Sequence, residues 1–229
     1  MVGGDDADRH DVLGFDDDPV GGHCDQRVEI ARGERIREVA LVIGEERLHE
    51  REIRPQRDLT IIGNDNAMPG VGIGKLVSAG LVRKTIASHI GLNPETQRKM
   101  IEGAMQVELV PQGTLIERIR AGGFGLGGIL TPTGVGTVVE EGKQRILVDG
   151  KPFLLETALR ADFALVQAFL ADYIGNLHYV LTARNFNPVI AMAADTVLVE
   201  AENIVPVGVI APDHVMTPGP IVDYLIASE

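Results

Sequence analysis

The sequence predicts an α/β fold, with a mainly parallel β-sheet, helices on both faces and a small antiparallel extension. Three short apolar runs, beginning at Leu59, Val82 and Val107, each end in polar or turn-forming residues. Such runs are typical of buried parallel strands that present ligand-facing residues at their carboxyl ends. Capped amphipathic segments separate them, which favours a sheet covered on both faces. The stretch 147–181 has fewer helix signals, so we expect the antiparallel extension there.

Two helices are predicted between and after these strands. The first starts with Asn93 as N-cap and Pro94 as first helical residue. Its buried face is predicted to contain Met100, Ile101 and Met105. The second starts with a capping box of Thr114 and Glu117. Its apolar stripe is Leu115, Ile116 and Ile119, and Gly122 and Gly123 end it.

Further elements are predicted towards the C-terminus. The expected strands are RILVDG, FLLE, FALVQAF, NLHYVL and TVLVEA. Asn187 before Pro188 indicates a capped helix over 187–195. Arg184 and Asn185 would then lie in the preceding loop, where we favour a structural role over ligand binding.

Composition excludes several function classes. The chain has 229 residues, is 45% hydrophobic and carries a formal net charge of −12, so it is a globular protein without a basic footprint for nucleic acid or anionic membranes. Its single cysteine, Cys24, cannot form an intrachain disulfide. Apolar runs stay short of the roughly 20 residues that span a bilayer, and no secretory leader opens the chain. We therefore expect a cytoplasmic protein.

The composition changes abruptly near residue 58. Residues 1–57 contain no Ser, Thr, Asn, Lys or Tyr and form charge clusters without a clear apolar face. We therefore divide the chain into an atypical N-terminal segment, 1–57, misassigned or divergent, and a domain over 58–229. A metal site of His10, His23 and Cys24 with nearby aspartates is the sharper interpretation of the first segment, and a poorly packed arm is the favoured one.

One strand end has the composition of a ligand site. Gln112, Gly113 and Thr114 join a predicted strand to a predicted helix, where a parallel sheet presents binding groups for a carbonyl or carboxylate. The alternative is structural: Gln112 ends a strand and Thr114 caps a helix. Both interpretations stay open. His89, at another strand end, has no visible acid or metal partner and is expected to be a hydrogen-bonded core residue.

The glycine-rich segment 122–136 does not match a nucleotide-binding motif. It lacks the lysine of a P-loop and does not open a helix after a strand. It is expected to be an uncharged loop that lies along an extended ligand or a partner chain, or else a packed Ω-type loop. No Ser/His/Asp, Cys/His or metal-ligand arrangement is visible, which suggests half of an active site.

The sequence also resembles a known family from about Arg57 onward. The similarity is carried by RDLTIIGNDNAMPGVGIGKLV, by IASHIGLNPETQRKMIEGAMQVELVPQGTLIERIRAGGFGLGGILTPTGVGTVVEEGK, and by FLLETALRADFALVQA, DYIGNLHY and ARNFNPVIAMAADTVLVE. In these segments the chain is similar to the α (A) subunit of family I CoA-transferases of the acetate/acetoacetate (3-oxoacid) type.

The resemblance implies a CoA-transferase/sugar-isomerase-like fold and an active site shared with a β subunit, commonly in an α2β2 assembly. It implies that a β-subunit glutamate attacks the acyl-CoA and becomes a glutamyl-CoA thioester, so no catalytic nucleophile is expected in this chain. Coenzyme A is then a substrate, no cofactor or metal is needed, and the second substrate is a small carboxylic acid. The expected substrate-binding residues are Asn64, Gln112, Gly113, Thr114, Gly122, Gly123 and Gly125.

The N-terminus departs from the family pattern. Family members begin with a strand and a GGFxxxGxP loop that contacts CoA, whereas MVGG at residues 1–4 continues into DDADRH. A catalytically incompetent binding or scaffolding subunit is therefore the runner-up function. A sugar-phosphate isomerase or deaminase is a third, disfavoured because it needs its own acid, base and phosphate site in this chain.

Overall fold

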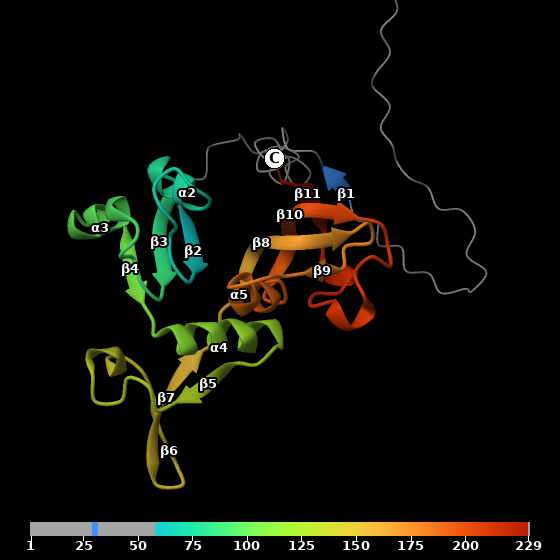
Figure 1. Ribbon diagram of the computed structural model, residues 1–229. Helices are drawn as coiled ribbons and strands as arrows, with labels where there is room; N and C mark the ends of the chain where they lie inside the picture. The colour runs from blue at the N-terminus through green and yellow to red at the C-terminus, as the bar shows by residue number, and fades with distance from the viewer. Residues whose placement is uncertain (1–28, 32–57, 229) are drawn as a thin grey trace, which may run out of the picture.

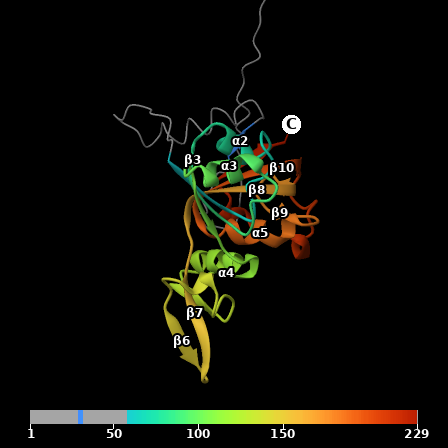
Figure 2. The ribbon, with the colours of Figure 1, turned by 90° about the vertical axis from the view of Figure 1, so that its left-hand side faces the viewer.

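The computed structural model describes residues 58–228 and the backbone of 29–31 (Figure 1). The predictions for the remaining N-terminal residues, including the metal site of His10, His23 and Cys24, lie outside the described residues. The chain forms two parallel sheets and one antiparallel sheet, so the α/β class is confirmed, although the expected single parallel sheet is divided in two. In both ribbon views the antiparallel sheet projects from the rest of the molecule (Figure 2).

The first parallel sheet contains the three apolar runs found in the sequence. Its strand order is β2-β3-β4. The elements of this half are β2 Leu59–Gly63, α2 Gly74–Ser78, β3 Val82–Ala87, α3 Pro94–Ile101 and β4 Gln106–Leu109. Val77 of α2 packs on Ile61, Val82 and Met105 in a small apolar core.

Helix α3 is capped as predicted but buries a different face. Asn93 is the N-cap, and its side chain accepts a hydrogen bond from the Thr96 amide at 2.9 Å. Met100 and Ile101, predicted to be buried, are 39% and 81% exposed. The buried residue of the helix is Thr96, because a polar network rather than an apolar core lies beneath it.

Helix α4, Gln112–Gly123, begins three residues earlier than predicted, because its N-cap is Pro111 and not Thr114. Pro111 is its N-cap, and the Leu115 amide donates to the Pro111 carbonyl at 2.9 Å. Thr114 therefore lies within the first turn, so the predicted capping box with Glu117 is wrong. The apolar stripe is confirmed, since Leu115 and Ile119 are buried, and the helix ends at the predicted glycines.

The second parallel sheet forms the other half of the molecule, with strand order β1-β11-β10-β8-β9. Its elements are β1 Glu29–Ala31, β8 Ala161–Asp172, β9 Leu177–His178, α5 Ala183–Ile190, β10 Ala194–Val205 and β11 Tyr224–Ala227. Strands β8, β10 and β11 are parallel, and their buried alanines, valines and Leu225 form the largest core cluster together with Tyr179.

Helix α5 corrects the prediction for 187–195. The helix starts at Ala183, so Asn187 is an interior residue rather than an N-cap, and its Nδ2 donates to the Gln167 carbonyl of β8 at 3.1 Å. Arg184 and Asn185 belong to the first turn rather than to a loop. Pro188 was expected to mark a helix start, but it lies inside this short helix.

The antiparallel sheet has strand order β5-β7-β6. Its strands are β5 Gly128–Thr131, β6 Arg145–Val148 and β7 Lys151–Thr157. The predicted antiparallel extension over 147–181 is therefore right for β7 and for the short pairing of β8 with β9, but wrong for the long pairing of β8 with β10, which is parallel. The glycine-rich segment is not one loop, because β5 lies inside it and pairs with β7.

Helices α4 and α5 join the two halves. Leu115 and Ile119 of α4 pack with Val189 of α5 and with Ile86 of β3 in one buried cluster. This contact places the N-terminus of α4 at the carboxyl edge of the first sheet (Figure 1). Among the described helices, none is long and apolar enough to cross a membrane.

Candidate active site

Polar side chains from three neighbouring strands meet at the carboxyl edge of the first sheet. Asn64 follows β2, Ser88 follows β3, and Gln112 follows β4 at the start of α4. Asn64 Oδ1 accepts from Gln112 Nε2 at 2.7 Å and from Ser88 Oγ at 2.7 Å. The structure therefore brings Asn64 and Gln112 together, 48 residues apart in sequence.

The backbone holds Asn64 in this position. Its carbonyl accepts from the Ser88 amide at 3.0 Å and lies 2.8 Å from Ser88 Oγ, whose single proton is shared between this carbonyl and Asn64 Oδ1. Because its Oδ1 already accepts two hydrogen bonds, the donors of Nδ2 are what this side chain can offer to a ligand. Asn64 is partly exposed and Gln112 is exposed, so both can be reached from solvent.

The N-terminus of α4 adds backbone donors beside this cluster. The amides of Gln112, Gly113 and Thr114 precede the first intrahelical hydrogen bond, and the partial positive charge of a helix N-terminus favours an oxyanion. Gly113 is exposed and nothing lies within 4 Å of where a Cβ would be, whereas Thr114 is only 5% exposed. At this end of the helix Gly113 is thus open to solvent, whereas the Thr114 side chain is not.

The other three predicted glycines lie away from this cluster. Helix α4 has 12 residues and therefore spans about 17 Å, which separates Gln112 from the glycines at its C-terminus. Gly122 is buried, and a Cβ on it would lie 1.9 Å from the Leu159 carbonyl oxygen. A Cβ on Gly123 would lie 3.0 Å from Met192 Cβ. The geometry accounts for both glycines by close packing.

Gly125 is explained by its backbone conformation rather than by close packing. Its φ is +72°, and the Leu126 amide donates to the Ala121 carbonyl at 2.8 Å while the Gly125 amide donates to the Gly122 carbonyl at 3.2 Å. This pair of bonds is the Schellman motif, in which glycine terminates a helix.

Two residues of the cluster were not assigned from the sequence. Ser88 was missed. The available signal was its position directly after β3, the strand that pairs with the one preceding Asn64. His89 was expected in the core, but its side chain is exposed and its Nδ1 lies 3.2 Å from Ser88 Oγ. The prediction failed because His89 stands past the end of β3, where the chain has left the apolar interior.

A charged cluster behind the site connects the first sheet to the antiparallel sheet. Buried Arg118 lies 3.1 Å from Glu108 and 3.8 Å from Glu156, and Lys143 lies 2.6 Å from Glu156. Burial of Glu108 disfavours its charged form, but hydrogen bonds and charge from Lys84 and Arg118 outweigh this, so its pKa is lowered. The cluster fixes α4 against β4 and β7.

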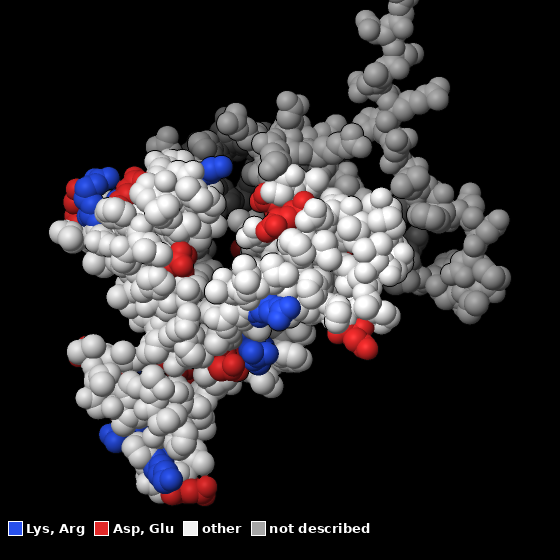
Figure 3. All heavy atoms as spheres, viewed as in Figure 1, with Lys and Arg blue, Asp and Glu red and all other residues white. Residues whose placement is uncertain are grey.

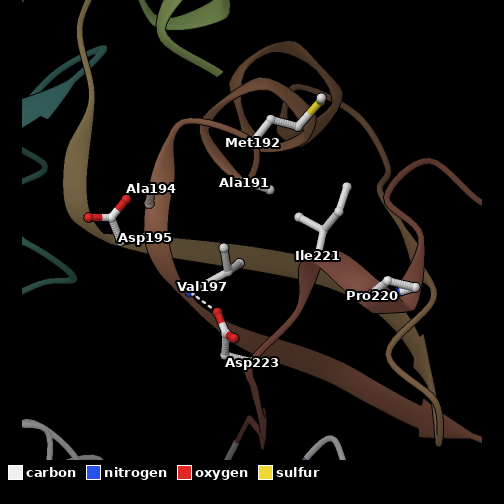
Figure 4. A pocket seen from close by; sticks show the side chains of 8 residues that line it. All are labelled: Ala191, Met192, Ala194, Asp195, Val197, Pro220, Ile221 and Asp223. Atoms are coloured by element: carbon white, nitrogen blue, oxygen red, sulfur yellow. Dashed lines mark hydrogen bonds between the residues drawn. The ribbon is translucent and has the colours of Figure 1, made fainter. Parts of the chain in front are cut away.

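A separate hollow of about 270 Å³ lies at the start of β10 (Figure 4). Its lining is Ala191, Met192, Ala194, Asp195, Val197, Pro220, Ile221 and Asp223. Asp223 accepts a hydrogen bond from the Val197 amide at 2.7 Å, and Asp195 pairs with Arg160 at 3.0 Å. None of the predicted substrate-binding residues lines this hollow.

Charged and metal-ligating side chains of the described residues add no further candidate site. On the face shown in Figure 3, acidic and basic side chains occur in small mixed groups. Within α3, Glu95 forms ion pairs with Arg98 and Lys99. Within residues 58–228, no group of three or more His, Cys, Asp or Glu is arranged to hold a metal ion.

Comparison with known proteins identifies the class. Residues 47–228 match the family model described as coenzyme A transferase, so the chain belongs to the coenzyme A transferase family. Within it the chain is similar to α-type subunits. It is 62% identical over 173 residues to the alpha subunit of the acetate CoA-transferase of Escherichia coli K12, covering 76% of this chain and 79% of that protein.

Two further relatives give the same class. The chain is 52% identical over 170 residues to the acetoacetyl-CoA:acetate/butyrate CoA transferase alpha subunit of Clostridium acetobutylicum, covering 74% and 78% of the two chains. It is 48% identical over 168 residues to the corresponding subunit of a succinyl-CoA:3-ketoacid coenzyme A transferase from Xanthomonas campestris, covering 73% and 69%. The chain is thus a family I CoA-transferase α subunit.

Solved structures confirm the fold. An acyl-CoA transferase from E. coli O157:H7, in a thioester complex with CoA, matches with a TM-score of 0.67 at 21% identity. The match covers 89% of this chain but 44% of that one, so this chain spans less than half of it. Glutaconate coenzyme A-transferase from Acidaminococcus fermentans matches with a TM-score of 0.64 at 19% identity, covering 75% and 62%.

Proposed function

We propose that this α subunit moves CoA between a short acyl-CoA, preferably a 3-oxoacyl-CoA, and a small carboxylic acid, in an α2β2 assembly with a β-type subunit. The observation that carries the proposal is the cluster of Asn64, Gln112 and the first turn of α4, which offers hydrogen-bond donors but no carboxylate. The similarity to acetate and acetoacetyl-CoA:acetate/butyrate transferase subunits supports the choice of substrates.

The nucleophile of the proposed reaction is a glutamate of the β-type subunit. Its carboxylate oxygen attacks the thioester carbonyl and forms a C–O bond. The C–S bond then breaks, which gives a mixed acyl–glutamyl anhydride and CoA thiolate. The thiolate then attacks the glutamyl carbonyl, which releases the first carboxylic acid and leaves a glutamyl-CoA thioester. A second carboxylate reverses these steps and leaves as the new acyl-CoA.

The described residues contribute charge stabilisation to these steps. Each attack places negative charge on a carbonyl oxygen, and donors fixed before the reaction stabilise such an oxyanion. Asn64 Nδ2 and the Gly113 amide are the proposed donors, with Gln112 and Ser88 orienting Asn64. Gly122, Gly123 and Gly125 are proposed to support the site indirectly, because they close the far end of α4.

Reconstitution tests the proposal. The chain is mixed with a cognate β-type subunit, and formation of acetyl-CoA from acetoacetyl-CoA and acetate is measured. A folded complex without exchange would reject the function. Gln112→Ala should lower kcat/KM at least about tenfold, since Asn64 then loses a partner that fixes its donor for the oxyanion. The matched control is Gln167→Ala, which removes an exposed glutamine side chain of β8.

A non-catalytic scaffolding role is the second candidate. One sequence feature favours it: residues 1–57 contain no GGFxxxGxP loop. Restoring that loop at the N-terminus separates the two candidates. A CoA-transferase subunit should gain turnover, whereas a scaffold stays inactive with the loop in place.

A further inference from the structure

A buried polar network lies beneath the loop that follows Asn64. Thr85 Oγ1 of β3 donates to Asn66 Oδ1 at 2.8 Å, and Asn66 Nδ2 donates to Thr96 Oγ1 of α3 at 3.2 Å. Asn93 Nδ2 donates to the Ala67 carbonyl at 2.9 Å. All four side chains, those of Asn66, Thr85, Asn93 and Thr96, are at most 1% exposed.

This network determines the path of residues 65–73. Ala67 has φ +52°, a left-handed conformation that is unfavourable for a residue with a Cβ. It is held there because Asp65 Oδ1 accepts from the Ala67 amide at 2.7 Å and Asn93 holds its carbonyl. Breaking one of the buried bonds leaves a polar atom without a partner, which is costly away from water.

Helix α2 fixes the same loop from its other end. A Cβ on Gly74 would lie 2.1 Å from the Met68 carbonyl oxygen, so the helix approaches the loop as closely as a glycine allows. Between these two fixed points Met68 and Val71 are 58% and 55% exposed. The loop that follows Asn64 therefore exposes apolar side chains to solvent, although its own interior side is polar and buried.

We infer that the Thr85–Asn66 hydrogen bond, supported by Asn93 and Thr96, is a positioning device that holds loop 65–73 in its binding conformation beside Asn64. The inference rests on the proposed function, because it takes the Asn64 cluster as the place where acyl-CoA binds. A preformed loop binds more tightly, since no ordering entropy is lost on binding. Loss of the bond should therefore weaken binding of acyl-CoA more than it slows turnover.

Thr85→Val tests this with a closely matched control. Valine keeps the shape of threonine but removes the hydroxyl that bonds Asn66. Thr217→Val makes the same change at another buried site, where Thr217 Oγ1 lies 2.8 Å from the Tyr179 hydroxyl in the second half of the molecule. Thr85→Ser keeps the hydroxyl and should restore the wild-type behaviour.

Two measurements are made on the complex with the β-type subunit. Thr85→Val should raise the KM for acetoacetyl-CoA about 3- to 10-fold, the range for one lost hydrogen bond, with kcat within about twofold. It should also accelerate tryptic cleavage after exposed Lys75, which lies in the first turn of α2, directly after the loop. Thr217→Val should change neither. If Thr85→Val does not fold, Thr96→Val removes the other partner of Asn66.

The outcomes separate this inference from the proposed function. If Gln112→Ala lowers exchange but Thr85→Val behaves like Thr217→Val, the site stands and the positioning role is refuted. If cleavage at Lys75 accelerates while Gln112→Ala has no effect, the network holds the loop but the proposed site is wrong. Equal KM changes in Thr85→Val and Thr85→Ser also refute the inference, because the hydroxyl is then irrelevant.

Discussion

Replacing Gly122 by alanine tests whether this glycine serves packing or ligand binding. The new Cβ would lie 1.9 Å from the Leu159 carbonyl oxygen and 2.7 Å from its carbonyl carbon. Favourable contacts occur at about 3.5 Å or more, so α4 and the β7–β8 connection must separate by roughly 1.5 Å. Overpacking of this kind costs about 1–3 kcal/mol, which exceeds the gain of up to about 1 kcal/mol for alanine over glycine in a helix.

The expected loss of stability is compared with that of a control substitution in the same helix. Gly113→Ala adds the same methyl group where nothing lies within 4 Å, so it should leave stability unchanged or raise it slightly. For Gly122→Ala we expect a loss of about 1–2 kcal/mol, which corresponds to a Tm lower by roughly 2–8 °C in a chain of this size. The assay is thermal unfolding of the complex with the β-type subunit.

The two substitutions also distinguish the two roles of glycine. If Gly122 only packs, the folded Gly122→Ala complex should keep its KM for acyl-CoA. A Tm equal to or above that of Gly113→Ala, together with a raised KM, would refute the packing argument. That result would instead support the ligand-binding role of Gly122 that the glycine-rich sequence suggests.

Three further outcomes are expected. The pKa of Glu108 is lowered in the folded protein. Its contribution to stability is therefore complete above the unfolded pKa of 4.5 and is lost as the pH falls through the folded pKa. On acidification below about pH 4.5, the Tm of Glu108→Gln should therefore fall less than the Tm of the wild type. Gln112→Glu should impair exchange more than Gln112→Ala in the same assay, because a carboxylate cannot donate to Asn64 Oδ1 and its charge repels an oxyanion bound nearby. The isolated chain should melt broadly and associate in sedimentation, since within the described residues β2 pairs on one side only; a sharp, concentration-independent melt would contradict this.

The strands and most helices follow from local sequence signals. The runs at β2, β3 and β4 are short, apolar and end in polar residues, and parallel pairing brings such ends to one edge. Gln112 and Asn64 could therefore be predicted as strand-end residues. Their hydrogen bond could not, because it depends on the order of the strands and on the packing of α4.

Errors arose where tertiary contacts outweighed local preference. Thr114 and Glu117 match a capping box, yet Pro111 starts α4 earlier and leaves Thr114 buried. Asn187 and Pro188 match a helix start, yet α5 already begins at Ala183, and the Asn187 side-chain amide donates to the Gln167 carbonyl of β8 instead of capping a helix. In both cases the sequence motif is real but another residue begins the helix.

The glycines show most clearly what the sequence leaves undecided. Gly113 and Gly122 lie in one helix, and their composition gives no sign that one faces solvent and the other a carbonyl oxygen. Only the position of Leu159, which follows β7, distinguishes them. A glycine-rich segment therefore indicates close approach of backbone, but it does not say what approaches. At Gly122 another part of the protein packs against the helix, whereas Gly113 is open to solvent. The α4 N-terminus is thus left exposed, and under the proposed function it is the end of the helix that lies beside the thioester.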